Sequence, residues 1–92
     1  MIDDLRKTLL EIEENDLNYP VRYGLVLRAM YLAHEAGFPA GIRMDNLAPE
    51  WPVVYIDLPT GQISWHMPQY YTTWDGHDTD TKYARIRKWV DQ

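Results

Sequence analysis

Residues 53–67 read Val53-Val-Tyr-Ile-Asp-Leu-Pro-Thr-Gly-Gln-Ile-Ser-Trp-His-Met67, and this stretch decides the fold. Apolar and polar side chains alternate on both sides of Pro59-Thr60-Gly61, and β-branched and aromatic residues are frequent in both halves. Two alternating runs around a short turn are typical of an antiparallel β-hairpin. The sequence therefore predicts strands at 53–58 and 62–67.

The apolar positions also predict how the two strands pair. Directly opposed residues of an antiparallel pair point to the same face, so apolar residues should oppose apolar residues. Pairing Leu58 with Ile63 meets this condition and places Ile56 opposite Trp65. Trp65 is thus expected in the core.

The same register predicts a second, polar face of the hairpin. It places Tyr55 opposite His66 and Asp57 opposite Ser64, with Gln62 close to the turn. Because these side chains can donate, accept or titrate, we expect a functional site to use this face.

Three helices are predicted outside the hairpin. Residues 2–15 carry apolar side chains every three or four positions, which is helical spacing. Residues 20–36 are apolar almost throughout, so we expect this helix to be the most buried. The last helix is predicted over 79–90, where Asp78 or Thr79 can cap its start. The second helix has one polar stripe, formed by Gly24, Arg28, Tyr31 and Glu35.

The order of these elements predicts the fold class. Residues 41–45 are a candidate third strand, because Ile42 and Met44 alternate with Arg43. Helices before and after a short run of strands favour an α+β fold, with helices packed on a small antiparallel sheet. A length of 92 residues leaves no room for a second core, so residues 1–92 are expected to form a single domain.

Composition excludes several classes of protein. The absence of Cys excludes disulfides, thiolate catalysis and Cys-type zinc sites, and favours the cytoplasm. The first residues are acidic and no apolar run approaches the roughly 20 residues that span a bilayer, so we expect neither export nor membrane insertion. A net charge of −5 disfavours tight binding to polynucleotides, which depends on neutralising many phosphates.

The strongest candidate site joins the end of the second hairpin strand to the segment before the last helix. That segment contains Trp74-Asp75-Gly76-His77, and the helix start behind it offers unpaired N–H groups that can bind an anion. Aromatic rings in the same segment could stack on a base. The predicted ligand-binding residues are Tyr55, Asp57, Ser64, Tyr70, Tyr71, Trp74, Thr79, Lys82 and Arg85, and the predicted catalytic residues are His66, Asp75 and His77.

Part of this set also has a purely structural interpretation. The aromatic residues at 70, 71 and 74 could form a small core beneath a loop, Asp75-Gly76 suits a tight turn, and Thr79 suits a helix cap. His66 and His77 occupy positions that neither capping nor packing requires.

Three functions remain open. The first is a non-enzymatic module that binds a small anionic molecule, with nucleotide-like ligands as one class. The second is a small hydrolase or metal-dependent enzyme in which His66 acts as general base beside His77 or Asp75. No short-spaced metal or catalytic motif occurs, no metal ligand is assigned, and the cofactor is unknown. The third is a protein-interaction or inhibitor domain, because four Trp and seven Tyr against one Phe suit an interface. A homo-oligomer through an exposed strand edge also stays open.

Two blocks of the chain, within residues 51–86, resemble a group of small uncharacterised bacteriophage and bacterial proteins. The blocks are Leu58-Pro-Thr-Gly-Gln-Ile-Ser-Trp-His66 and Trp74-Asp-Gly-His-Asp-Thr79 followed by Lys82-Tyr-Ala-Arg-Ile86. The group carries no established activity, so the resemblance assigns no catalytic residue. It implies a phage-type accessory protein in the host cytoplasm, of the kind that binds a host protein or a nucleotide signal of host defence.

Overall fold

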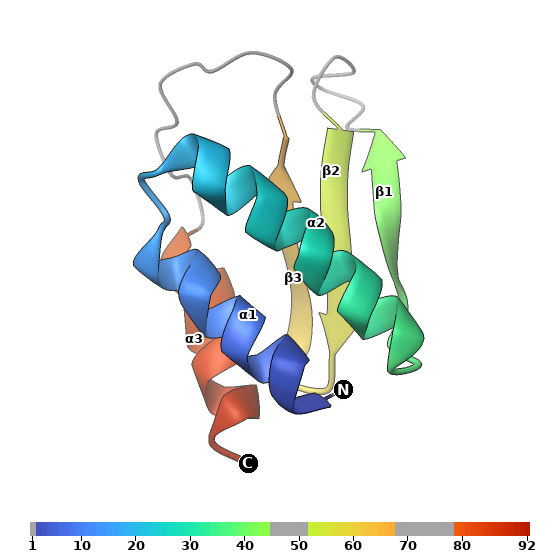
Figure 1. The fold of residues 1–92 in the computed structure, drawn as a ribbon. Helices are drawn as coiled ribbons and strands as arrows, with labels where there is room; N and C mark the ends of the chain where they lie inside the picture. The colour runs from blue at the N-terminus through green and yellow to red at the C-terminus, as the bar shows by residue number, and fades with distance from the viewer. Residues whose placement is uncertain (1, 45–51, 68–78) are drawn as a thin grey trace.

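The computed structural model describes residues 2–44, 52–67 and 79–92, which form three helices and three strands. In chain order these are α1 (Ile2–Glu14), α2 (Tyr19–Glu35), β1 (Ala40–Met44), β2 (Pro52–Leu58), β3 (Gly61–His66) and α3 (Thr79–Val90). The strands form an antiparallel sheet in the order β1-β2-β3. Helices α1 and α2 lie across one face of this sheet, and α3 lies beside β3 and behind α1 (Figure 1). The α+β prediction is confirmed, and the predicted elements, the third strand included, agree with these bounds to within one residue.

Helix α1 packs as its spacing predicts. Leu5, Leu9 and Ile12 are fully buried, while Ile2 at the start of the helix is exposed. The buried positions recur every three or four residues, so they form the apolar stripe that contacts α2 and α3.

Helix α2 is less buried than its composition predicts, and the expectation that it would be the most buried helix was wrong. Its buried positions are Arg22, Val26, Ala29 and Ala33, which are spaced as one narrow stripe. Leu25, Leu27, Met30 and Leu32 are only partly buried against the core. Helix α2 contacts α1 and the sheet, and its remaining surface is not covered by another described element. The predicted polar stripe of α2 is exposed, as expected.

The hairpin register differs from the predicted one by two residues. Ile56 pairs with Ile63 and Leu58 pairs with Gly61, so Pro59-Thr60 forms a two-residue turn. A shift of two residues keeps every side chain on its predicted face, so the alternation of apolar residues could not distinguish the two registers. The conformation of the turn distinguishes the two registers. Gly61, which follows the turn, has φ 131°, a conformation that residues with a side chain rarely adopt.

The core lies between the helices and one face of the sheet. Trp65 in β3 is fully buried, as predicted, and is the largest of the fully buried side chains among the described residues. The sheet contributes Val54, Ile56, Leu58, Ile63 and Trp65, the residue after β3 contributes Met67, and α3 contributes Tyr83, Ile86 and Trp89. Within the described ranges, no helix has the length and apolarity to span a bilayer.

Candidate functional site

The outer face of the sheet, opposite the core, carries four of the predicted site residues. Tyr55 and Asp57 in β2 share this face with Ser64 and His66 in β3, and all four are half-buried. The two-residue shift changes their partners: Tyr55 faces Ser64 rather than His66, and Asp57 faces Gln62 rather than Ser64. The predicted face is thus confirmed, and the predicted pairings on it are wrong.

A polar network occupies the turn end of this face. Gln62 donates a 2.6 Å hydrogen bond to the Asp57 carboxylate and accepts a 3.2 Å bond from Arg43 in β1. The Arg43 guanidinium carbon also lies 5.6 Å from the centre of the Tyr55 ring. Asp57 and Tyr55 are therefore engaged in contacts that join the three strands.

A second arrangement lies where β3 meets α3. Gln62 and Ser64 from the strand, and Thr81, Lys82 and Arg85 from the helix, line a hollow of about 250 Å³. Three residues predicted for ligand binding, Ser64, Lys82 and Arg85, are thus brought together across 21 positions of sequence, since the helix lies along the outer edge of β3.

The two cationic residues of this hollow are held differently. Arg85 is exposed, and its Nη1 donates to the main-chain carbonyl of Gln62. Thr60 in the hairpin turn donates a 2.8 Å hydrogen bond to the Arg85 carbonyl, which ties the turn to the helix. Lys82 is only 6% exposed, and its ammonium lies 5.4 Å from the centre of the Trp65 ring. The hollow is therefore lined by one exposed cationic residue, Arg85, and by one buried cationic residue, Lys82, which lies against the core.

The remaining predicted site residues lie elsewhere or outside the described residues. His66 shares a face with Ser64 but is not among the residues that line the hollow. Thr79 is the first residue of α3, and its side chain is outside the described part. Tyr70, Tyr71, Trp74, Asp75 and His77 all lie outside it. The convergence of His66 with Asp75 and His77, on which the enzyme hypothesis depends, stays a prediction.

A buried polar cluster, which the sequence interpretation missed, joins α1, α2 and α3. Arg22 is fully buried, and its Nη1 lies 3.4 Å from Oδ1 of Asp16 in the connection between α1 and α2. Tyr83 of α3 donates a 2.5 Å hydrogen bond to the same carboxylate oxygen. The Arg22 guanidinium carbon also lies 5.3 Å from the centre of the Tyr19 ring.

Burial raises the pKa of the Tyr83 phenol above its ordinary value of 10.0, and the hydrogen bond to Asp16 raises it further. The neighbouring Trp65 indole and the charge of Arg22 act in the opposite direction but do not cancel the effect. Tyr83 is therefore a neutral hydrogen-bond donor at physiological pH.

The sequence contained one signal for this cluster. Arg22 falls on the same helical stripe as Val26, Ala29 and Ala33, three positions that the structure buries. An arginine in line with buried apolar residues requires a buried acceptor. Asp16 is a candidate for that acceptor, but the sequence shows only that the helical pattern ends near residues 15–20 and does not indicate which acidic side chain turns inward.

No group of three or more His, Asp or Glu side chains in residues 2–44, 52–67 and 79–92 has the arrangement to hold a metal ion. Each of the two polar arrangements contains a buried cationic residue: Lys82 lies in the hollow between β3 and α3, and Arg22 lies in the Asp16 cluster.

Comparison with known proteins gives a family. No curated protein and no solved structure matched the chain. A family model described as the WDGH domain matches residues 11–89, which include the last turn of α1, all of α2, the sheet and almost all of α3. The chain carries a tetrapeptide with the same four letters, Trp74-Asp75-Gly76-His77, which Asp78 separates from the first residue of α3. Because the match covers most of its length, the chain belongs to the WDGH domain family.

Proposed function

We propose that this chain binds a small anionic molecule in the hollow between β3 and α3. The observation that supports the proposal is the meeting of Ser64, Lys82 and Arg85 around one hollow of about 250 Å³. A hydroxyl donor beside two cationic side chains offers charge-assisted hydrogen bonds to a phosphate or a carboxylate.

Arg85 is the main recognition residue in this proposal. A guanidinium has five N–H donors in a fixed plane. The bond from Nη1 to the Gln62 carbonyl orients that plane, and the side chain is exposed, so further donors can reach a ligand. Ser64 adds a hydroxyl from the strand, and Lys82 adds a second positive charge from a position that is buried against Trp65.

The size and charge of the site limit the class of ligand. A hollow of about 250 Å³ is slightly smaller than the roughly 300–1,000 Å³ of typical small-molecule sites, so it suits one anionic group rather than a long chain. The net charge of −5 also opposes binding to polynucleotides. We therefore propose that the hollow takes a phosphate group, and that the rest of a nucleotide-like molecule lies outside it. Nucleotide signals of host defence, which the phage resemblance suggests, are one source of such a molecule.

Thermal-shift measurements test this proposal with inorganic phosphate, AMP, ATP and a cyclic dinucleotide. The wild-type chain should show a rise in melting temperature with at least one of them. Arg85→Gln and Ser64→Ala should lose that rise. The matched control is Arg28→Gln, because Arg28 is exposed on α2, away from the hollow, and should leave the rise unchanged. Absence of a shift for the wild type with every member of the panel at millimolar concentration would contradict the proposal.

A second control separates this hollow from the rest of the predicted site. Tyr55 and Asp57 do not line the hollow and are engaged with Arg43 and Gln62. Tyr55→Phe should therefore leave the ligand-induced shift intact. Equal loss of the shift in Tyr55→Phe and Arg85→Gln would place the ligand on the outer face of the sheet instead.

A further inference from the structure

The outer edge of β1 has the geometry of a strand that can accept another strand. The Asp57 amide donates a 2.8 Å hydrogen bond to the Pro39 carbonyl. The pairing of β1 with β2 continues from there in register, so Gly41 and Arg43 direct their main-chain groups toward β2. Alternate residues of an antiparallel strand direct their main-chain groups to opposite sides. Ala40, Ile42 and Met44 therefore direct their N–H and C=O groups away from β2, and no strand of the described residues pairs with that edge.

The same three residues place apolar side chains on the helix face of the sheet. Ile42 pairs with the buried residue Val54, and Ala40 pairs with the buried residue Ile56, so this row continues the core face. Ile42 and Met44 are nevertheless each 57% exposed, because α2 does not cover them. An open edge with exposed apolar side chains is a template for pairing with another chain.

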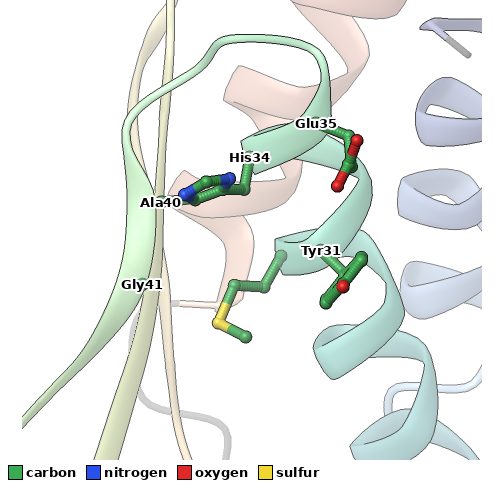
Figure 2. A pocket seen from close by; sticks show the side chains of 6 residues that line it. Tyr31, His34, Glu35, Ala40 and Gly41 are labelled. Carbon is green, nitrogen blue, oxygen red and sulfur yellow. The ribbon is translucent and has the colours of Figure 1, made fainter.

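A hollow of about 290 Å³ lies beside this edge, between the C-terminal half of α2 and the start of β1. It is lined by Met30, Tyr31, His34, Glu35, Ala40 and Gly41. Figure 2 shows His34 reaching from α2 toward Ala40, so the helix and the strand form its two walls. The lining is largely apolar, and Tyr31 at its border is 68% exposed.

We propose that a second copy of this chain occupies the edge, with the two β1 strands paired antiparallel about a twofold axis at Ile42. Ile42 is the middle residue of β1, so this register aligns the main-chain groups that point outward on both copies. Each Ala40 then lies opposite Met44 of the second copy. Ala40 lines the hollow, so in this register the exposed Met44 side chain of each copy lies beside the hollow of the other copy.

The charges on the strand are compatible with this self-pairing. In the twofold register Arg43 lies opposite Gly41 of the second copy on the outer face, so no like charges meet directly across the seam. The side chains that the seam brings together on the helix face are Ala40, Ile42 and Met44 from both copies. The contact covers the two exposed apolar side chains of β1 and joins two three-stranded sheets into one.

Sedimentation velocity of the full chain over about 1 µM to 500 µM tests the proposal, a range that reports dimers of micromolar affinity. The wild type should show a concentration-dependent dimer. Ile42→Lys should weaken it at least about tenfold, since it places two charges at the centre of an apolar seam. Leu17→Lys is the matched control, because Leu17 is 91% exposed in the connection between α1 and α2 and should not change the dimer. Circular dichroism checks that both variants keep the fold.

Cysteine cross-linking tests the register, and the chain has no Cys of its own to interfere. Residues opposed at a twofold axis have Cα atoms about 5.5 Å apart, within the range for a disulfide. Ile42→Cys should therefore form a covalent dimer on mild oxidation. Met44→Cys should not, because four residues of offset separate its two copies by about 14 Å. A wild-type chain that is monomeric at the highest concentration, or cross-linking that is as efficient at 44 as at 42, would overturn the proposal.

Discussion

The Tyr83 hydroxyl and the Asp16 carboxylate form a 2.5 Å hydrogen bond across 67 positions of sequence. This contact joins α3 to the connection between α1 and α2, beside the buried guanidinium of Arg22. Helix α3 also carries Lys82 and Arg85 of the proposed anion site. The position of these cations relative to β3 therefore depends in part on a polar contact at the far side of the helix.

Tyr83→Phe removes the hydroxyl and keeps the ring. Because the lost hydrogen bond is donated to a charged group, we expect the free energy of unfolding to fall by about 1.5–3 kcal/mol. Urea denaturation followed by circular dichroism measures this change. Tyr23→Phe is the control, because the Tyr23 side chain is partly exposed. Loss of its hydroxyl should change the free energy of unfolding by less than about 0.5 kcal/mol.

The pH dependence of stability gives an independent test of the same residue. The raised pKa of Tyr83 keeps its phenol protonated in the folded chain when the unfolded chain has begun to ionise at its ordinary value of 10.0. The unfolded state then binds fewer protons, so the contribution of Tyr83 is complete below pH 10 and is lost as the pH rises above it. We expect the wild type to lose up to about 1.4 kcal/mol per pH unit more than Tyr83→Phe above pH 10. Parallel stability curves for the two proteins would contradict this assignment.

Two Asp–Arg pairs that differ in burial should respond differently to the loss of the carboxylate. Asp16→Ala removes a carboxylate beside Arg22, whose side chain is 1% exposed, and should cost about 3 kcal/mol. Asp3→Ala breaks a pair with Arg6 in which Asp3 is 97% exposed, and should cost less than about 1 kcal/mol. Thermal or urea denaturation measures both losses. Equal losses in the free energy of unfolding for the two variants would show that the buried guanidinium of Arg22 does not depend on Asp16 for its stabilisation.

Gly61 and Gly24 should give substitutions of opposite sign. At Gly61, with φ 131°, a Cβ would lie 2.9 Å from Nε of Arg85, so Gly61→Ala should destabilise by about 1–2 kcal/mol and displace Arg85. At Gly24, inside α2, a Cβ meets nothing within 4 Å, and Gly24→Ala should stabilise by about 0.5–1 kcal/mol. Denaturation measures both, and the anion affinity of Gly61→Ala should fall while that of Gly24→Ala should not.

The sequence predicted the elements and the faces of this fold because both depend on local spacing. Alternation in residues 53–67 assigned each side chain to the core face or the outer face, and the structure confirms it. It could not fix the register, since a shift of two residues leaves every face unchanged and only the conformation of Gly61 selects the turn. Arg22 was missed because its burial depends on Asp16 and Tyr83, which tertiary packing brings together.

The candidate site was predicted in part for the same reason. Ser64, Lys82 and Arg85 meet because α3 lies along the edge of β3, a relationship that the order of elements suggested but did not define. Gln62 contacts three distant residues: its carbonyl accepts a hydrogen bond from Arg85, and its side chain joins Arg43 to Asp57. These contacts depend on packing between distant segments. No spacing within a single segment could have revealed them.

The central claim is that an anion binds between β3 and α3. The most direct test measures the amide chemical shifts of the wild-type chain during titration with phosphate and then with ATP. The account predicts saturable changes concentrated at residues 62–64 and 81–85, with the same titration of Arg85→Gln giving little change. Changes centred on the outer face at Tyr55, or no saturable change at millimolar ligand, would contradict it.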